Sequence, residues 1–402
     1  MLLAGMLISA VYAGEIKVSV LLTPKQRAAY HEVFHIFSQK TGIKVRMVAK
    51  SDTDYKHILP IWLLGGKDTP DVLHWQASQR LFFYAEKDVI RPLTRLWHEE
   101  NMDRHFAHTK SSVTYNKEVY AVPVSYYHWG LLYKKSLIKK YGGVPKDWQA
   151  FIALCEKMKN AGITPIAIGT KNSWPAAAWF DYLNLRINGL EFHQQLLNGK
   201  ISFYHPRVQE VLIEWKRLID KKFFNQGSQR FTWDEILPGL YREWFGFILI
   251  GNFVTNKLPQ QLIQDFSFMP FPQIANIPLY EKAPTEVFMI AKNTRKIKEA
   301  EAFIKFISQP EIQSMLNKAL GYLPPHNAAT IGQNDFIQFG AKLLKQAKGL
   351  AQYFDRETLP AFEKKAIPLL AEFIITGNIE QTTYKLEQAR ASIFLNNTIN
   401  ND

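Results

Sequence analysis

The sequence predicts an α/β fold in which mainly parallel sheets are flanked by helices. Segments rich in β-branched residues alternate with helical patterns of about ten to fifteen residues, which is typical of βαβ units. The chain has 402 residues, enough for two or three domains or for one large bilobed body. Hydrophobic residues make up 47% of the chain, which excludes an intrinsically disordered, collagen-like or coiled-coil protein.

The alternation is clearest near the N-terminus. Three segments have the composition of strands: 15–22, 43–48 and 70–75. Two amphipathic helical patterns lie between them: 24–40 and 54–64. Ligands of such sheets bind beyond the carboxyl ends of the strands, so this rule points to residues 50–54 and to Trp75-Gln76.

The rest of the chain contains more helix. Segment 118–134 holds two β-rich pieces on either side of 125–130. The later strand candidates are 245–250, 266–271 and 287–291. The clearest later helical patterns are 148–160, 206–221 and 297–308. Helices dominate from 148 to 219 and again in the tail, and no low-complexity linker appears, so we expect short connections between domains.

The chain is basic, because Lys and Arg exceed Asp and Glu by 49 − 36 = 13. The basic residues are scattered, and no run of them is longer than two. Such pairs, within or beside helical patterns, are typical of a solvated face and not of a nucleic-acid groove. We therefore expect no nucleic-acid partner.

Residues 1–13 (MLLAGMLISAVYA) have the apolar region and the small residues of a secretory signal peptide and its cleavage site. The positively charged start of such a peptide is missing, so we expect the true translation start to lie upstream. A buried N-terminal helix is the alternative. No Cys follows the apolar stretch, so we expect a soluble periplasmic protein without a lipoprotein anchor.

Six segments, in order along the chain, resemble the family 1 extracellular solute-binding proteins. These are the carbohydrate-binding partners of ABC importers, with maltose-binding protein as the familiar member. The segments are 34–45 (FHIFSQKTGIKV), 69–75 (TPDVLHW), 118–135 (EVYAVPVSYYHWGLLYKK), 145–148 (PKDW), 283–310 and 321–325 (GYLPP). Two segments depart from the family pattern: 284–286 (PTE), where a Gly pair is common, and 244–248 (WFGFI), where small residues are usual.

The resemblance implies a two-lobed periplasmic binding protein fold of the class II type, whose lobes close on a ligand. The chain would cross between the lobes three times, near 122–126, 268–271 and 322–326. The lobes that follow are 14–122 with 272–322 (the N-lobe) and 126–268 with 327–402 (the C-lobe).

A saccharide offers flat apolar faces to aromatic rings and hydroxyl groups to polar side chains. Residues of both kinds lie at the predicted cleft positions. The expected ligand contacts are Asp52, Asp54, Trp75, Gln76, Tyr126, Tyr127, Trp174, Asn252 and Glu286. Core packing is the alternative role for the aromatic residues, and capping of the next helix is the alternative for the two aspartates.

The sequence contains no HExxH, GxSxG, GxxxxGK[ST] or GxGxxG motif, so we expect no catalytic residues. The single cysteine, Cys155, excludes a disulfide framework and a CxxC metal site. His31 and His35 have the i, i+4 spacing of metal ligands, but no acidic third ligand is evident. We therefore expect no metal and no cofactor.

The expected function is capture of a sugar or small oligosaccharide for the membrane permease subunits of an ABC importer, by a monomer. One alternative keeps the fold but binds an anionic ligand, such as a glycerol phosphodiester or a uronic-acid oligomer. Another is a periplasmic sensor role, in which the closed form contacts a receptor or kinase ectodomain. The high aromatic content, 13% of the chain, favours the neutral sugar.

Overall fold

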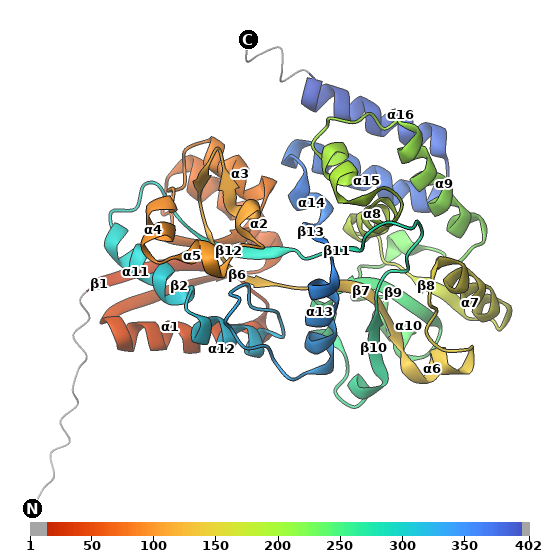
Figure 1. The fold of residues 1–402 in the computed structure, drawn as a ribbon, viewed down its shortest axis with the longest axis horizontal. Helices are drawn as coiled ribbons and strands as arrows, with labels where there is room; N and C mark the ends of the chain where they lie inside the picture. The colour runs from red at the N-terminus through yellow and green to blue at the C-terminus, as the bar shows by residue number, and fades with distance from the viewer. Residues whose placement is uncertain (1–13, 396–402) are drawn as a thin grey trace, which may run out of the picture. The chain divides into compact units, whose positions relative to one another are not determined.

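The computed structural model describes residues 14–395, so the predicted signal peptide at 1–13 lies outside the described residues. The chain forms two compact units, and each contains a sheet flanked by helices (Figure 1). Among these residues, unit 1 consists of 14–126, 285–320 and 324–331, and unit 2 consists of 127–284, 321–323 and 332–395. No helix within the described range combines the length and apolar character that crossing a membrane requires.

Unit 1 is built on a five-stranded sheet of order β2-β1-β3-β12-β6. Its strands are β1 (Gly14–Leu21), β2 (Ile43–Lys50), β3 (Val72–Gln76), β6 (Val122–Tyr126) and β12 (Thr285–Ile290). Its longer helices are α1 (Arg27–Thr41), α2 (Asp52–Gly65), α3 (Gln79–Glu86), α11 (Ile297–Ile307) and α12 (Pro310–Leu320). Shorter elements are η1 (Pro24–Gln26), α4 (Thr94–Glu99), α5 (Met102–His105), η2 (Lys110–Val113), β4 (Thr114–Tyr115) and β5 (Glu118–Val119). In Figure 1, α1 and α12 lie on one side of this sheet, and α2 and α3 lie on the other.

Unit 2 is built on a four-stranded sheet of order β10-β7-β9-β8. Its strands are β7 (Trp129–Lys134), β8 (Thr164–Ala167), β9 (Phe245–Gly251) and β10 (Phe266–Met269), and β11 (Tyr280–Lys282) pairs separately with β13 (Gly349–Ala351). Its longer helices are α7 (Trp148–Asn160), α8 (Trp174–Leu197), α9 (Pro206–Asp220), α13 (Asp335–Gln346), α15 (Pro360–Thr376) and α16 (Ile379–Arg390). Shorter helices are α6 (Lys135–Lys140), η3 (Ser228–Arg230), α10 (Leu237–Tyr241), η4 (Asn252–Lys257), η5 (Ile263–Asp265), α14 (Phe354–Glu357) and a terminal π-turn (Ala391–Leu395).

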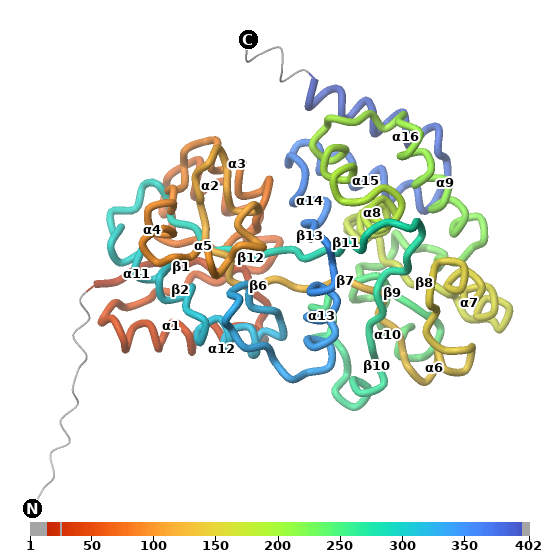
Figure 2. Tube along the Cα trace, viewed as in Figure 1, coloured from red at the N-terminus to blue at the C-terminus, as the bar shows by residue number. Residues whose placement is uncertain are grey.

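The C-terminal helices belong to the core of unit 2. Figure 2 shows α15 and α16, in blue, beside α8 and α9, in green, and these helices are in contact. Phe362, Leu370 and Phe373 of α15 are buried together with Trp215 of α9 in the main core of this unit. The tail therefore completes unit 2 and is not an appendage.

The predicted α/β fold class is confirmed, and both sheets are mixed, with one reversed strand in each. In unit 1, β2, β1, β3 and β6 run in one direction and β12 runs against its neighbours. In unit 2, β8, β9 and β10 share a direction and β7 is reversed. In the described chain, each reversed strand follows a passage between the units. β7 is the first strand after the chain enters unit 2 at residue 127, and β12 is the first strand after it returns to unit 1 at residue 285.

The boundaries of the units differ from the lobe boundaries that the sequence predicts. The first boundary falls between 126 and 127, four residues after the predicted end at 122. Residues 272–284, assigned above to the N-lobe, belong to unit 2, because β11 lies in this segment and pairs with β13 of the same unit. At the third passage, residues 321–323 belong to unit 2, residues 324–331 belong to unit 1, and the chain from 332 belongs to unit 2 again.

Most predicted elements have counterparts in the structure, but β8 was missed. Its sequence, TPIA, is short and contains Pro165, which obscures a strand in a region dominated by helices. β8 lies at the edge of its sheet, where a proline is tolerated.

Candidate functional site

In unit 1, polar side chains gather where three adjacent strands meet the same edge of the sheet. Gln76 ends β3, Glu286 lies at the start of the reversed strand β12, and Ser125 lies near the end of β6. The register pairs Gln76 with Glu286 and Glu286 with Ser125, so the three residues form one row across the strands. With Arg80 and Tyr126 they are called the unit 1 site below.

The unit 1 site holds buried polar groups. Gln76 and Glu286 are 5% and 8% exposed, and the Arg80 guanidinium donates a hydrogen bond to Gln76 Oε1. Glu286 Oε2 also lies 3.9 Å from Nε2 of the buried His74. Ser125 Oγ is buried and has no hydrogen-bond partner within residues 14–395. An unpaired buried hydroxyl is costly unless something else binds it, so Ser125 points to a ligand.

Tyr126 ends β6 at the same edge of the sheet and is only partly buried. Burial raises the pKa of Tyr126 to about 12, so its hydroxyl stays protonated and can donate a hydrogen bond. The ring of His108 meets the Tyr126 ring edge-on at 5.9 Å. Tyr126 therefore has the exposure and the protonation state that a ligand contact requires.

Trp75 is held inside unit 1. Its side chain is 5% exposed and stacks on Tyr55, with the ring centroids 5.9 Å apart. Its Nε1 donates to the carbonyl of Arg80 over 3.0 Å, so the polar atom of the ring is already bonded. These contacts favour the core-packing role for Trp75, and a ligand contact by this ring stays a prediction.

Asp52 and Asp54 are exposed in the first turn of α2. Asp54 takes part in capping, because Ser51 Oγ accepts from the Asp54 amide and donates to Asp54 Oδ2 over 2.7 Å. Asp52 accepts from Lys56 Nζ over 2.9 Å. Both carboxylates thus stabilise the helix start, and their binding of ligand hydroxyls stays a prediction.

In unit 2, aromatic rings converge where β9 ends and β7 begins, with Trp129 paired to Gly251. The rings are those of Tyr127, Trp129, Trp174, Phe253 and Tyr353, called the unit 2 site below. Phe253 is central, with ring centroids 5.6 Å from Tyr127, 5.9 Å from Trp129 and 6.3 Å from Trp174. Trp129 also stacks on Tyr353 at 4.8 Å.

The exposed fraction separates the members of this cluster. Trp129 is 2% exposed and Tyr127 is 8% exposed, whereas Trp174 and Phe253 are only partly buried. Trp174 is the first residue of α8 and follows Ser173, whose φ of 60° turns the chain into the helix. Trp174 therefore combines a fixed backbone with an accessible ring, which suits a stacking contact.

Polar atoms border the aromatic cluster. Asn252 Nδ2 donates to the carbonyl of Gly321 over 2.9 Å, which ties η4 to the third passage of the chain. Asn252 Oδ1 and Trp129 Nε1 are both buried, and neither has a hydrogen-bond partner in the described part of the chain. Arg356 Nη2 donates to the Tyr127 hydroxyl over 3.0 Å and so fixes that ring.

Sequence reasoning missed Tyr353 of the unit 2 site and the neighbouring Arg356. Both lie in the C-terminal part, where the sequence predicted only helices. Phe253 directly follows the predicted contact Asn252, at a position where the sequence places an aromatic ring after a strand.

A buried charged network lies in unit 2 around β11. Lys282 Nζ lies 2.8 Å from Asp181 Oδ2 and 3.0 Å from His193 Nε2, and all three residues are almost fully buried. Arg186 pairs with Glu281, which also accepts from the Tyr182 hydroxyl over 3.0 Å. Burial raises the pKa of Asp181 to about 7 against the influence of Lys282, and burial lowers the pKa of His193. The network fixes β11 to α8 just before the chain passes from unit 2 to unit 1.

Two solved structures of solute-binding proteins superpose on this chain over most of its length. The solved structure of the bacterial solute receptor AcbH superposes with a TM-score of 0.88 and 26% identity, covering 95% of this chain and 99% of AcbH. AcbH is described as having an exclusive substrate preference for β-D-galactopyranose. A chitin oligosaccharide binding protein shares the fold, with a TM-score of 0.83 and 16% identity over 95% of this chain and 99% of that one.

Sequence relatives agree. An uncharacterised ABC transporter extracellular-binding protein of Pyrococcus horikoshii is 26% identical over 70% of this chain, but the match spans only 64% of that relative. A probable sugar-binding periplasmic protein of Rhizobium meliloti is 23% identical over 81% of this chain and 83% of its own length. Residues 23–314, well over half of the chain, match the family described as bacterial extracellular solute-binding protein. The family resemblance is therefore confirmed, and this chain belongs to the bacterial extracellular solute-binding proteins.

Proposed function

We propose that the protein binds a sugar or small oligosaccharide and presents it to the permease subunits of an ABC importer. The unit 1 site and the unit 2 site each supply candidate contacts to the ligand. The expected contacts are Gln76, Tyr126, Tyr127, Trp174 and Glu286, with Asn252 beside them. Asp52, Asp54 and Trp75 remain candidates of lower priority because their side chains already have partners.

The observation that carries this proposal is the composition of the two sites. The unit 2 site supplies rings for the apolar faces of a pyranose, and Trp174 is more accessible than Trp129, the other tryptophan of this site. Asn252 Oδ1 and Trp129 Nε1 supply unused hydrogen-bonding capacity at the unit 2 site. Ser125 Oγ supplies it at the unit 1 site, where Ser125 pairs with Glu286. Sugar hydroxyls both donate and accept, so they satisfy all three kinds of atom.

The charges at the sites favour a neutral ligand over an anionic one. Among the nine predicted contacts, Asp52, Asp54 and Glu286 are acidic and none is a cation. Arg80 and Arg356 are nearby, but each guanidinium donates to a neighbouring side chain, Gln76 or Tyr127. An anionic ligand would therefore meet carboxylates before it met a free cation.

The proposed protein is a non-enzymatic, monomeric periplasmic protein that needs no cofactor. A sensor role, in which the closed form contacts a receptor or kinase ectodomain, would use the same ligand site. The two roles differ only in which membrane partner the loaded protein contacts.

A thermal-shift screen against neutral sugars, with galactose first because of the preference described for AcbH, tests the proposal. A ligand at 100 times its dissociation constant adds about 2.7 kcal/mol to the free energy of unfolding, a shift of several degrees. Trp174→Ala should weaken binding of the best sugar by about tenfold or more, since one stacked ring is lost.

Trp244→Ala is the matched control, because Trp244 is 58% exposed and lies at the opposite edge of the unit 2 sheet. We expect this control to bind the neutral sugar with unchanged affinity. The proposal fails if no neutral sugar raises the unfolding temperature, or if both tryptophan variants bind like the unchanged protein.

A further inference from the structure

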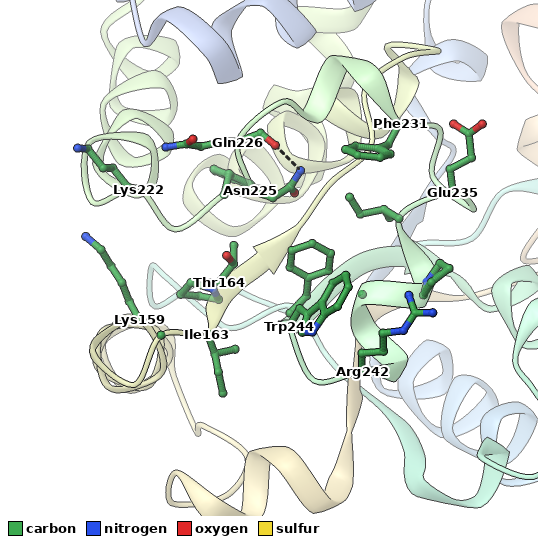
Figure 3. A pocket seen from close by; sticks show the side chains of 17 residues that line it. Lys159, Ile163, Thr164, Lys222, Asn225, Gln226, Phe231, Glu235, Arg242 and Trp244 are labelled. Atoms are coloured by element: carbon green, nitrogen blue, oxygen red, sulfur yellow. Dashed lines mark hydrogen bonds between the residues drawn. The ribbon is translucent and has the colours of Figure 1, made fainter.

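Unit 2 carries a pocket at the end of its sheet that lies away from the unit 2 site. This pocket has a volume of about 620 Å³ and is lined by Thr164 and Phe245, the first residues of β8 and β9 (Figure 3). Asn252, by contrast, follows the carboxyl end of β9. The hollow, called the Trp244 pocket below, therefore lies at the edge of the sheet opposite to the unit 2 site.

Trp244 presents an exposed ring on a fixed backbone. The ring is 58% exposed, and Phe231, which also lines the pocket, is 38% exposed. The Trp244 amide donates to Gly239 O over 2.9 Å, and its carbonyl accepts from the Thr164 amide over 3.1 Å. The preceding Glu243 has a φ of 62°, and its carboxylate holds Lys134 at 2.6 Å. A strained residue and three pairings thus hold a large apolar ring in contact with water, which is typical of a binding platform.

The rim of the Trp244 pocket is positively charged. Figure 3 shows Lys159 and Lys222 on one side of the pocket and Arg242 beside Trp244 on the other. The Arg242 guanidinium lies 5.2 Å from the centre of the Trp244 ring. In the part of the chain that the structure describes, none of these three cations forms an ion pair with a carboxylate, although Lys159 Nζ donates to the Lys221 carbonyl over 2.8 Å.

The Trp244 pocket is also lined by one carboxylate and two side-chain amides. Glu235 is the one acidic lining residue among those described, and its Oε2 accepts from the Thr232 amide over 2.8 Å. Asn225 and Gln226 add side-chain amides, and Figure 3 shows both of them beside Lys222. Asn225 Oδ1 accepts from the Ile168 amide over 2.7 Å, so Asn225 offers a ligand only its Nδ2 group, which lies 3.5 Å from the Gln226 carbonyl. Exposed rings, amides and unpaired cations together fit a ligand that has flat apolar faces, hydroxyl groups and negative charge.

We propose that the Trp244 pocket is a second binding site, which takes an oligosaccharide of acidic sugars. A pyranose ring stacks on Trp244, its carboxylate is bound by Arg242, and its hydroxyls are bound by Asn225 and Gln226. A further carboxylate along the same oligomer reaches Lys159 and Lys222 on the other side. The site is separate from the proposed neutral-sugar site and does not depend on it.

Isothermal titration with trigalacturonate, using the full protein at low ionic strength, tests this site. We expect binding to the unchanged protein that weakens as salt is added, because unpaired cations supply much of the attraction. Trp244→Ala should weaken trigalacturonate binding by about tenfold, and Trp244→Phe should weaken it less, since a smaller ring remains. Arg242→Gln should also weaken binding and reduce its salt dependence.

Trp174→Ala separates the two sites, because it lies at the unit 2 site. We expect this variant to bind trigalacturonate like the unchanged protein, and saturation with the best neutral sugar should leave that binding intact. Equal affinity in the Trp244→Ala and unchanged proteins, or no binding at all, overturns the proposal. Loss of trigalacturonate binding in Trp174→Ala alone would also overturn it and would move the acidic ligand to the principal site. The thermal unfolding of Trp244→Ala, whose ring is exposed, checks that the variant is folded.

Discussion

Tyr126 and Thr285 are neighbouring residues of the unit 1 sheet, although they lie on distant parts of the chain. Tyr126 ends β6 and pairs with Thr285, which begins β12. Tyr126 is the last residue before the chain leaves unit 1 for unit 2, and Thr285 is the first residue after it returns. The first passage between the units therefore begins, and the second ends, at the same point of the unit 1 sheet.

This pairing predicts that a cross-link between the two positions restrains both passages. In the double variant Tyr126→Cys/Thr285→Cys, we expect a disulfide to form under oxidation, because directly paired strand residues have suitable spacing. The oxidised form should bind the best sugar more weakly than the reduced form of the same variant, as measured by titration calorimetry. Cys155 is buried and its thiol pKa is raised, so it does not compete. Equal affinities of the two redox forms would show that the passages do not need to move apart.

Asn252 predicts a combined effect on stability and binding. Asn252→Ala removes the hydrogen bond to Gly321 O and leaves that carbonyl unsatisfied, so the free energy of unfolding should fall by about 1–3 kcal/mol. The variant also loses the unpaired Oδ1, so sugar affinity should fall as well. Urea unfolding and calorimetry measure the two effects. A stability equal to that of the unchanged protein would mean that the bond to the third passage is unimportant.

Because the Lys282–Asp181 ion pair is buried, we expect removal of one partner to lower the stability of the fold strongly. Lys282→Met leaves the Asp181 carboxylate buried without its cation and should lower the free energy of unfolding by about 3–5 kcal/mol. The double variant Asp181→Asn/Lys282→Met should recover much of this loss, because no unpaired charge remains. Lys216→Met is the control, since Lys216 and Asp220 form an exposed pair whose loss costs about 1 kcal/mol or less. Similar losses in the two single variants would contradict the assignment.

His128 predicts acid sensitivity in unit 2. The ring is fully buried against Phe268 and Phe339, and burial lowers its pKa to about 3. The unfolded chain binds a proton at this side chain below about pH 6.5 and the folded protein does so only below about pH 3, so acidification between these values destabilises the fold.

We therefore expect His128→Leu to lose about 4–5 kcal/mol less stability than the unchanged protein between pH 7 and pH 3, since each pKa unit is worth about 1.4 kcal/mol. Unfolding by urea at a series of pH values gives the two curves. His31→Leu, on the exposed side of α1, serves as the control for replacing a histidine with a leucine. Parallel curves for His128→Leu and the unchanged protein would rule out this role.

The sequence predicted the elements whose pattern is local. The alternation of β1, α1, β2, α2 and β3 is visible because each element has its own periodicity and stop signal, such as the Gly42 that ends α1 with a φ of 69°. The sequence could not place residues 272–284, because the pairing of β11 with β13 joins segments that are distant in the chain. The same limit hid Tyr353, whose stacking on Trp129 leaves no trace in either segment.

The surroundings of the predicted site residues could be predicted only in part, for the same reason. Gln76 follows from the rule on strand ends, and Tyr126 follows from the first crossing that the family resemblance implies; the structure places both at the same end of the unit 1 strands. Trp75 follows from the same rule, but a strand sends successive side chains to opposite faces, and its ring packs on Tyr55 inside the unit. A residue that ends a strand is thus identified by position, and its exposure is decided by packing that the sequence does not display.

The reversed strand β12 has a consequence for the order in which the chain can fold. β12 lies between β3 and β6, so these two strands cannot complete their ladders until residues 285–290 have been synthesised. By then most of unit 2 has already emerged, while its own core still lacks α15 and α16. Neither unit can therefore complete its fold on the nascent chain until most of the other unit has been synthesised. The polypeptide keeps unpaired strand edges until late in its synthesis.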